Sequence, residues 1–318
     1  MTRITKGPEE EAEHKERIKV VEEFTGKKVS RVVNRLLTPP DDEQSLCFQH
    51  SVICQTGLPY RDPGPKVLEW RRDQGAASLL LTAGKVRNPE TGDWEHLGLP
   101  SGTKARLVLA HLNAEALRQK SPLIEVEESL SAFVRRIRGF NNGREITAFK
   151  KQLSRLASAQ ISLSIIHNKR SIQTDSKIIH KFDLWLEKDD RQRVLWPSTI
   201  QLSKDYFDSL QNHAVPLNES DIAALSHSAM ALDIYAWLAQ RLHRIPANQP
   251  ARISWAALSA QFGYGYSRQR AFRVEFTEQL RAVKTRYFSA DIDLDENGMI
   301  ASCSPPPVAK RGNIIAAR

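Results

Sequence analysis

Cysteine is scarce in this 318-residue chain, and long apolar runs are missing. The three cysteines, Cys47, Cys54 and Cys303, cannot all pair with one another, and so few thiols are typical of a reducing compartment. We therefore expect no structural disulfide. No stretch approaches the ~18 apolar residues of a membrane span, and the N-terminal residues lack the apolar region of a secretory signal. These absences predict a soluble protein of the bacterial cytoplasm with no membrane partner.

Sequence motifs for catalysis are also missing. The string nearest to a phosphate-binding loop, GLPSGTKAR, has Thr103 before Lys104 and leads into an Arg-bearing helix, so it does not fit that motif. The nine histidines never form the His-x-His pair that a metal-dependent nicking enzyme needs beside its tyrosine. We therefore expect a protein that is not an enzyme and that uses no cofactor.

One segment, CFQHSVIC, raises the question of a metal site. Cys47, His50 and Cys54 offer three zinc ligands, but a closed structural site needs four, and no Cys-x-x-Cys pair is present. The other interpretation is that Cys47 and Cys54 pack with Val52 and Ile53 as small apolar residues. We favour this second interpretation and expect no metal.

The positive charge of the chain is concentrated in two windows. The net charge is +9 and the isoelectric point is about 9.5. Residues 135–155 hold seven basic side chains and one acidic, and residues 266–290 hold six basic and two acidic. The rest of the chain is therefore close to neutral. Such clustering is typical of a surface that contacts a polyanion.

Composition divides the chain into four parts. An N-terminal arm over residues 1–44 is rich in Glu, Lys and Arg and ends near Pro39 and Pro40. A Pro-rich, basic tail follows over residues 305–318. Between them we expect a first module over 45–203 and a second over 204–304.

The second module reads as helix, short strand, helix, turn, helix and hairpin. Apolar residues at helical spacing predict a helix over 231–245. A second helix begins after the cap Ser254 and stops at Gly263, a third spans 268–288, and a hairpin with an Asn297-Gly298 turn spans 289–303. This is the order of a winged helix.

The first module repeats that order. We expect a helix over 103–119 capped by Thr103, a strand over 123–128, a helix over 129–139, a third helix over 144–160, and a hairpin made of 161–174 followed by 177–187. Both third helices contain Phe-x-x-Gln-Leu, beginning at Phe149 and Phe276. The predicted fold class is α+β, mainly α, with tandem winged-helix modules. Two unrelated small α+β domains are the alternative.

The third helix of each module carries a cationic face opposite an apolar stripe. In the second module the stripe contains Phe272, Phe276, Leu280 and Val283. The opposite side presents Arg270, Arg273, Thr277, Arg281 and Lys284. Cations at these positions suit the phosphates and guanine edges of a major groove.

The first module has a broader version of this face. Ile146, Phe149, Leu153 and Leu156 form its apolar stripe. The predicted DNA-facing residues are Arg144, Thr147, Lys150, Lys151, Ser154 and Arg155, together with Lys169 and Arg170 at a hairpin tip, His167 to Arg170. A merely solvated charged face is the alternative for a single helix, and the presence of two equivalent copies disfavours it.

Several longer strings resemble plasmid-encoded RepA-type replication initiators. They run in order from about Ser45 to Val308: LPYRDPG, GLPSGTKARLVLAHLNAEAL, LWPSTIQLSKDYFDSL, VPLNESDIAALSHSAMALDIYAWLAQRLHRI, ISWAALSAQFGY, FRVEFTEQLRAV and SPPPV. One departure is Ser101, where an aromatic residue is expected. The resemblance implies an initiator that binds repeated double-stranded sites at a plasmid origin, recruits host replication proteins, and represses its own gene as a homodimer.

Two other functions fit parts of the sequence. A winged-helix transcriptional regulator without a role in initiation would share every physical feature described above. An enzyme that processes nucleic acid would instead nick DNA or hydrolyse nucleotides with magnesium. Plasmid maintenance distinguishes the first of these from an initiator, and magnesium-dependent activity distinguishes the second.

Overall fold

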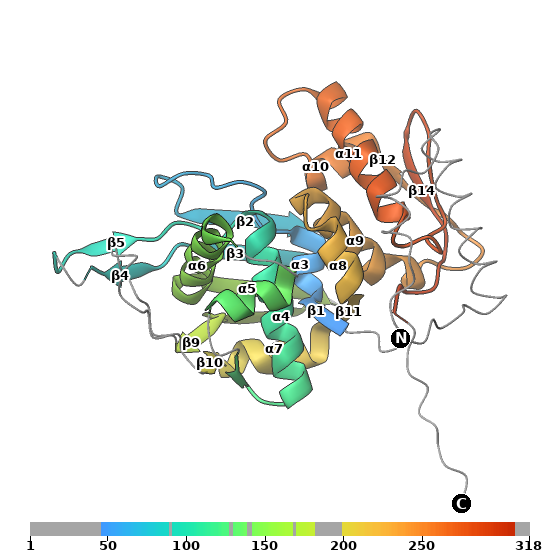
Figure 1. Cartoon of the computed structure of the whole chain (residues 1–318). Helices are drawn as coiled ribbons and strands as arrows, with labels where there is room; N and C mark the ends of the chain where they lie inside the picture. The colour runs from blue at the N-terminus through green and yellow to red at the C-terminus, as the bar shows by residue number, and fades with distance from the viewer. Residues whose placement is uncertain are drawn as a thin grey trace, which may run out of the picture.

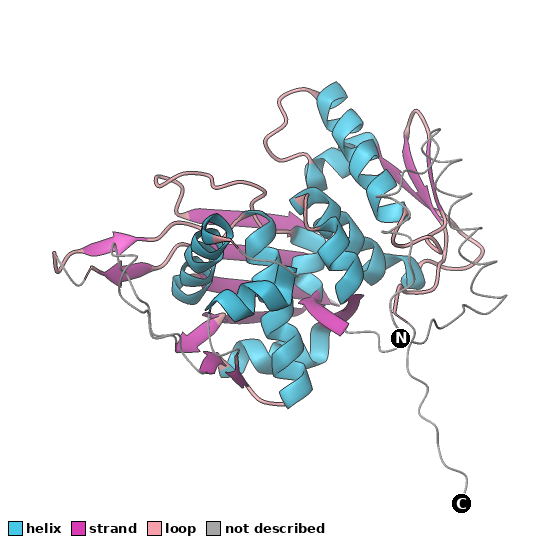
Figure 2. Cartoon of the chain, in the orientation of Figure 1, coloured by secondary structure: helices cyan, strands magenta, loops and turns pink. Residues whose placement is uncertain are grey.

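The computed structural model describes residues 46–88, 91–126, 130–138, 142–167, 170–181 and 199–308. The expected N-terminal arm and most of the expected C-terminal tail lie outside these ranges. The described chain is a mixed α+β structure in which helices pack against several small sheets (Figure 2). The mixed helix and strand content predicted from the sequence is therefore confirmed.

From α9 (Ala229–Arg241) onward the C-terminal part of the chain has the predicted order of elements, and α8 (Glu219–Leu225), which precedes α9, was not predicted. A short 3-10 turn (Leu242–Arg244) follows α9. Strand β12 (Ala251–Ser254), helices α10 (Trp255–Phe262) and α11 (Gln269–Lys284), and strands β13 (Ile292–Leu294) and β14 (Gly298–Ala301) follow. Ser254 caps α10 by accepting from the Ala257 N–H, and Gly263 ends it, as predicted. The strands form an antiparallel sheet in the order β12-β14-β13.

The N-terminal part repeats this connectivity. It contains α4 (Gly102–Gln119), β6 (Leu123–Glu125), α5 (Leu130–Arg138), α6 (Gly143–Ser158), β9 (Ile179–Lys181) and β10 (Thr199–Leu202). The sheet order is β6-β10-β9, so the first strand pairs with the third in both copies. The predicted cap at Thr103 is wrong: Thr103 lies inside α4, and the N-cap position belongs to Ser101.

The predicted hairpin of the first copy has a different role from the one expected. Strands β7 (Gln160–His167) and β8 (Arg170–Lys177) do pair with each other, but β7 also pairs with β3 (Ala77–Thr82), which pairs with β2 (Glu69–Gln74). The result is a four-stranded sheet, β2-β3-β7-β8, and β9 with β10 takes the place that β13 and β14 hold in the second copy. Local alternation of side chains predicts a strand but does not identify its distant partner.

A short antiparallel pair of strands joins the N-terminal and C-terminal parts of the chain, here called the first and second halves, which divide near residue 203. β1 (Leu46–His50) pairs with β11 (Ala214–Asn218), and each strand leads into a short helix, α3 (Ser51–Thr56) and α8. His50 and Asn218 cap these helices through their side chains. Helix α7 (Lys204–His213) precedes β11, and β4 (Lys85–Arg87) with β5 (Trp94–His96) forms a ribbon at the far left of Figure 1.

A buried ion pair links α4 of the first half to α9 of the second. Arg106 Nε and Nη2 donate to the two carboxylate oxygens of Asp233 at 2.6 and 2.7 Å. The remaining guanidinium donors reach the carbonyl oxygens of Leu58, Pro59 and Gly102, so the buried cation is fully hydrogen-bonded. Burial disfavours the charge of Arg106, but the Asp233 carboxylate outweighs it and raises the pKa of Arg106.

A second contact between the halves lies at the end of α10. Arg72 Nη2, from β2, donates to the carbonyl oxygens of Ala260 and Gln261 at 2.8 and 2.5 Å. Trp70 meets Tyr264 edge to face, with ring centres 4.3 Å apart. A cation at a helix C-terminus satisfies carbonyls that have no partner within the helix. The turn between α10 and α11 is thereby held against the first half.

The C-terminal packing continues past the predicted end of the second module. Tyr287 Oη donates to the carbonyl oxygen of Pro305 at 2.6 Å, and Val308 is buried. The first residues of the predicted tail, 305–308, are therefore packed on the protein. Composition alone did not predict this, because a Pro-rich segment can lie along a surface without forming a helix or strand.

The CFQHSVIC segment packs as the apolar interpretation predicts. Cys47, Val52, Ile53 and Cys54 are buried, and burial raises the pKa of both thiols. His50 Nδ1 accepts from the Val52 N–H at 3.2 Å, and its Nε2 lies 3.0 Å from Ser209 Oγ. Within the described ranges no group of three or more ligating side chains could hold a metal ion.

We expect Asp233→Asn to destabilise the protein by about 3–5 kcal/mol, because it leaves Arg106 as a buried charge without its counterion. Urea denaturation followed by circular dichroism measures the effect. Asp208→Asn is the matched control, since Asp208 pairs with Lys204 on an exposed helix face and its loss costs within about 1 kcal/mol. Equal midpoints for the two variants would show that the buried pair contributes no more than a surface pair.

We expect His50 to make folding sensitive to acid. Burial, together with the nearby His213 ring, lowers the pKa of His50 to about 3, whereas an unfolded histidine has a pKa near 6.5. The unfolded state therefore binds the proton more readily, so His50 contributes stability above pH 6.5 that is lost as the pH falls toward 3. Between pH 7 and 5 the wild type should lose about 2 kcal/mol more than His50→Asn, whose amide preserves the cap.

Unfolding free energies measured at both pH values test this expectation. His227→Asn, at an exposed histidine, is the control and should keep the slope of the wild type. A His50→Asn protein that loses stability with acid as steeply as the wild type would mean that His50 protonates without cost in the folded state.

Candidate nucleic-acid interface

Helix α11 is held by an aromatic core under one face. Phe272, Phe276, Leu280 and Val283 are all fully buried, as the spacing predicted. The rings of Trp255 and Phe262 on α10 lie 6.0 and 5.5 Å from the Phe276 ring. This core orients the helix so that its opposite face points to solvent.

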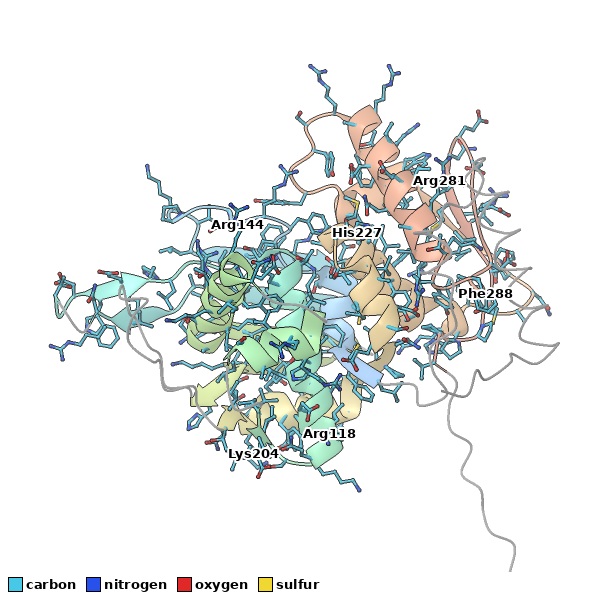
Figure 3. The ribbon with its side chains drawn as sticks, viewed as in Figure 1. Arg118, Arg144, Lys204, His227, Arg281 and Phe288 are labelled. Carbon is cyan, nitrogen blue, oxygen red and sulfur yellow. The ribbon has the colours of Figure 1, made fainter. Side chains whose placement is uncertain are left out.

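The outward face of α11 carries most of the predicted cations. Arg270, Arg273 and Arg281 are exposed and Thr277 is partly exposed. Arg270 and Arg281 are eleven residues apart, which places them within about 20° of each other around the helix. The Arg273 guanidinium lies 5.1 Å from the Trp255 ring centre, so a ring of α10 helps to orient it. Figure 3 labels Arg281 on this helix.

Lys284 is placed differently from the other four. Its ammonium group donates to the carbonyl oxygen of Ala290. Burial lowers the pKa of Lys284, and the carboxylates of Asp291 and Asp293 oppose that shift. Lys284 thus fastens the end of α11 to the segment that precedes β13, at one end of the exposed cationic face.

Helix α6 presents the corresponding face of the first half. Asn142 caps it by accepting from the Glu145 N–H, and Phe149, Leu153 and Leu156 are buried. The structure brings five predicted residues to the outward side of this helix: Arg144, Thr147 and Lys151 are exposed, and Lys150 and Ser154 are partly exposed. Lys151 lies 3.6 Å from Asp62. Arg144 is labelled near the top of α6 in Figure 3.

The prediction that Arg155 shares this outward face is wrong. Its side chain is buried, and its guanidinium donates to the carbonyl oxygens of Leu97 and Leu99 and to Asp62 Oδ2 at 2.7 Å. Helical periodicity placed Arg155 at the edge of a broad polar arc, and the segment over 97–99 covers that edge. Arg155 therefore holds α6 against its neighbours.

The predicted hairpin tip is described only in part. Lys169 lies outside the described residues, as does Asn168. The backbone of Arg170 pairs with that of His167 at the end of β7 and β8, and neither side chain is described.

Two exposed cations near α11 were not predicted. Arg268 occupies the N-cap position of α11, and Arg61 lies in the segment between α3 and β2. Burial and the Glu275 carboxylate raise the pKa of Tyr266, and the positive charge of Arg61 opposes this shift. Arg268 lay within the basic window, so that window was the signal that could have identified it.

None of the helices in the described ranges is long and apolar enough to cross a bilayer.

Comparison with known proteins relates the chain to one family and one fold. A family model described as plasmid encoded RepA protein matches residues 99–257, half of the chain. No curated protein matches it.

The fold resembles solved structures of RctB domains 2 and 3. The selenomethionine derivative aligns with a TM-score of 0.50 at 8% identity, covering 79% of this chain and 98% of the other. A second structure of the same two domains has a TM-score of 0.48 at 8% identity, covering 79% and 94%. The first likeness shows a shared fold, and the matched family model shows the family. The chain belongs to the family of plasmid-encoded RepA proteins, and it adopts a fold like that of RctB domains 2 and 3.

Proposed function

We propose that this protein is a plasmid replication initiator that binds repeated double-stranded sites at an origin through two winged-helix modules. The observation that carries the proposal is the repeated connectivity, in which each copy sets a third helix with cations on its outward face beside a three-stranded sheet of the same strand order. We assign residues 45–203 to the first module and 204–304 to the second. The inserted strands β7 and β8 distinguish the first from the second.

Each third helix lies in a major groove in this proposal. Arg270, Arg273, Thr277 and Arg281 contact bases and phosphates in one half-site, and Lys284 is a minor contributor because its ammonium group is already bonded. The first module reads a neighbouring half-site through Arg144, Thr147, Lys150, Lys151 and Ser154, with Lys169 and Arg170 reaching the adjacent backbone. Arg268 adds a phosphate contact at the start of α11.

The biological role follows from the family. The protein marks or opens an origin for host replication proteins, controls plasmid copy number, and represses its own gene as a homodimer. It acts in the bacterial cytoplasm on nucleoid or plasmid DNA, without catalytic chemistry of its own. A winged-helix regulator is the alternative, and replication distinguishes the two, because a plasmid that keeps its copy number after deletion of this gene does not use it as an initiator.

Arg270→Ala combined with Arg281→Ala should weaken specific DNA binding by about 1–3 kcal/mol for each lost base contact. The slope of the logarithm of the binding constant against the logarithm of the salt concentration should become shallower by about 0.9 for each lost phosphate contact. Both side chains are exposed, so the fold should be unchanged. Footprinting on DNA that flanks the gene locates the site, and fluorescence anisotropy at several salt concentrations measures the affinity.

A charge-matched control separates a specific contact from a general loss of positive charge. Lys85→Ala combined with Lys177→Ala removes two exposed cations from strands of the first half and should leave affinity and salt slope near those of the wild type. Equal losses in the two double variants would contradict the assignment of α11 as a recognition helix.

A further inference from the structure

A groove of about 550 Å³ lies where the C-terminal end of α9 meets the start of β12, and no residue of α11 lines it. Three arginines and three glutamines line it: Arg241, Arg244, Arg252, Gln55, Gln240 and Gln249. Gln55 comes from α3 in the first half, and the other five come from the second half. Among the described residues that line the groove there is no carboxylate.

Arg241 is held in place without a counterion. Its guanidinium lies 5.4 Å from the centre of the Trp237 ring, and its Nε is buried with no hydrogen-bond partner. No described carboxylate lies within ion-pair distance of it. A buried donor left in this state costs about 1–3 kcal/mol, so the arrangement favours any ligand that supplies an acceptor or a negative charge.

The other two arginines add charge to the same place. Arg244 makes one long contact, from its Nε to His243 Nε2 at 3.4 Å, and no described carboxylate pairs with it. Arg252 reaches Asp295 at 3.3 Å but is largely exposed. Two of the three positive charges in the groove are therefore uncompensated within the described part of the chain.

Like charges in a partly buried groove repel one another, and this repulsion is removed most directly by a bound anion. The planar guanidinium fork matches the geometry of phosphate oxygens, and glutamine amides supply further donors. Burial lowers the pKa of Arg241, as expected for a cation held partly out of water without a partner.

We propose that this groove is a phosphate-binding site formed by Arg241 and Arg244, with the amide of Gln249 completing the shell. Gln55 Nε2 already donates to the carbonyl oxygen of Ser51 at 3.1 Å and offers its second proton. The ligand is a phosphate group that comes either from a free phosphate compound or from the backbone of bound DNA. No residue of α11 lines the site, and its test with free phosphate does not depend on the proposed function.

The test compares the full-length wild type with Arg241→Gln combined with Arg244→Gln. In a first arm, differential scanning fluorimetry follows the melting temperature against inorganic phosphate, with sodium chloride at matched ionic strength as the reference. In a second arm, fluorescence anisotropy measures affinity for duplex DNA from the footprinted region. Lys85→Gln combined with Lys177→Gln is the charge-matched control in both arms, because neither residue lines the groove.

If the site binds free phosphate, phosphate raises the melting temperature of the wild type and of the control. The groove variant then needs at least tenfold more phosphate for the same rise, and its DNA affinity is unchanged. A site for backbone phosphate predicts at least a tenfold loss of DNA affinity in the groove variant alone. If phosphate stabilises all three proteins equally and DNA affinity is the same in all three, the proposal is wrong. If the groove variant melts well below the wild type without ligand, the single variant Arg244→Gln replaces it and the same outcomes apply.

Discussion

The contact on which the arrangement of this protein depends is the buried pair between Arg106 and Asp233. It joins the first long helix of one half to the corresponding helix of the other, and the surrounding carbonyl groups satisfy the remaining guanidinium donors. Such a pair contributes little net free energy, because desolvation offsets the Coulomb attraction, but it is strongly directional. Two apolar surfaces could slide against each other, whereas this pair permits one relative position. Its value to the protein therefore lies in geometry more than in stability.

Two other sets of contacts also hold the two halves against each other. The β1–β11 pair fixes one edge, and Arg72 with Trp70 fixes the turn that leads into α11. These contacts connect the part of the chain that carries α6 to the part that carries α11 (Figure 1). In the function proposed above, where each half reads a half-site, these contacts set the spacing between the sites that the protein binds. The arginine groove lies beside the same junction, with Gln55 from one half and Arg241 from the other, so its shape also depends on that arrangement.

Some features of this protein are local to one helix, and others depend on segments that are distant in the chain. The third helices were predicted well, since a stripe such as Phe272, Phe276, Leu280 is a local property with the period of one helix. Arg155 was misplaced, because its position at the edge of a polar arc did not reveal that a distant segment covers it. The role of β7 and β8 was misassigned for a similar reason, since both edges of β7 are paired and the partner on one edge, β3, lies about eighty residues earlier. Lys284 was predicted to be a DNA-facing residue of α11, but its ammonium group donates to the carbonyl oxygen of Ala290.

By itself the sequence did not predict α3, α7 or α8, but it determined the order of the three helices in each module, the caps at Ser254 and Gly263, the aromatic stripe beneath α11 and the membership of the RepA family. These depend on residues within a few turns of one another, or on strings long enough to be characteristic. Only the tertiary structure decided which strands are neighbours, which charges remain in solvent, and where charges without counterions gather. The reason is that solvent exposure and strand pairing depend on segments far away in the chain, and a periodic pattern contains no information about what will cover it.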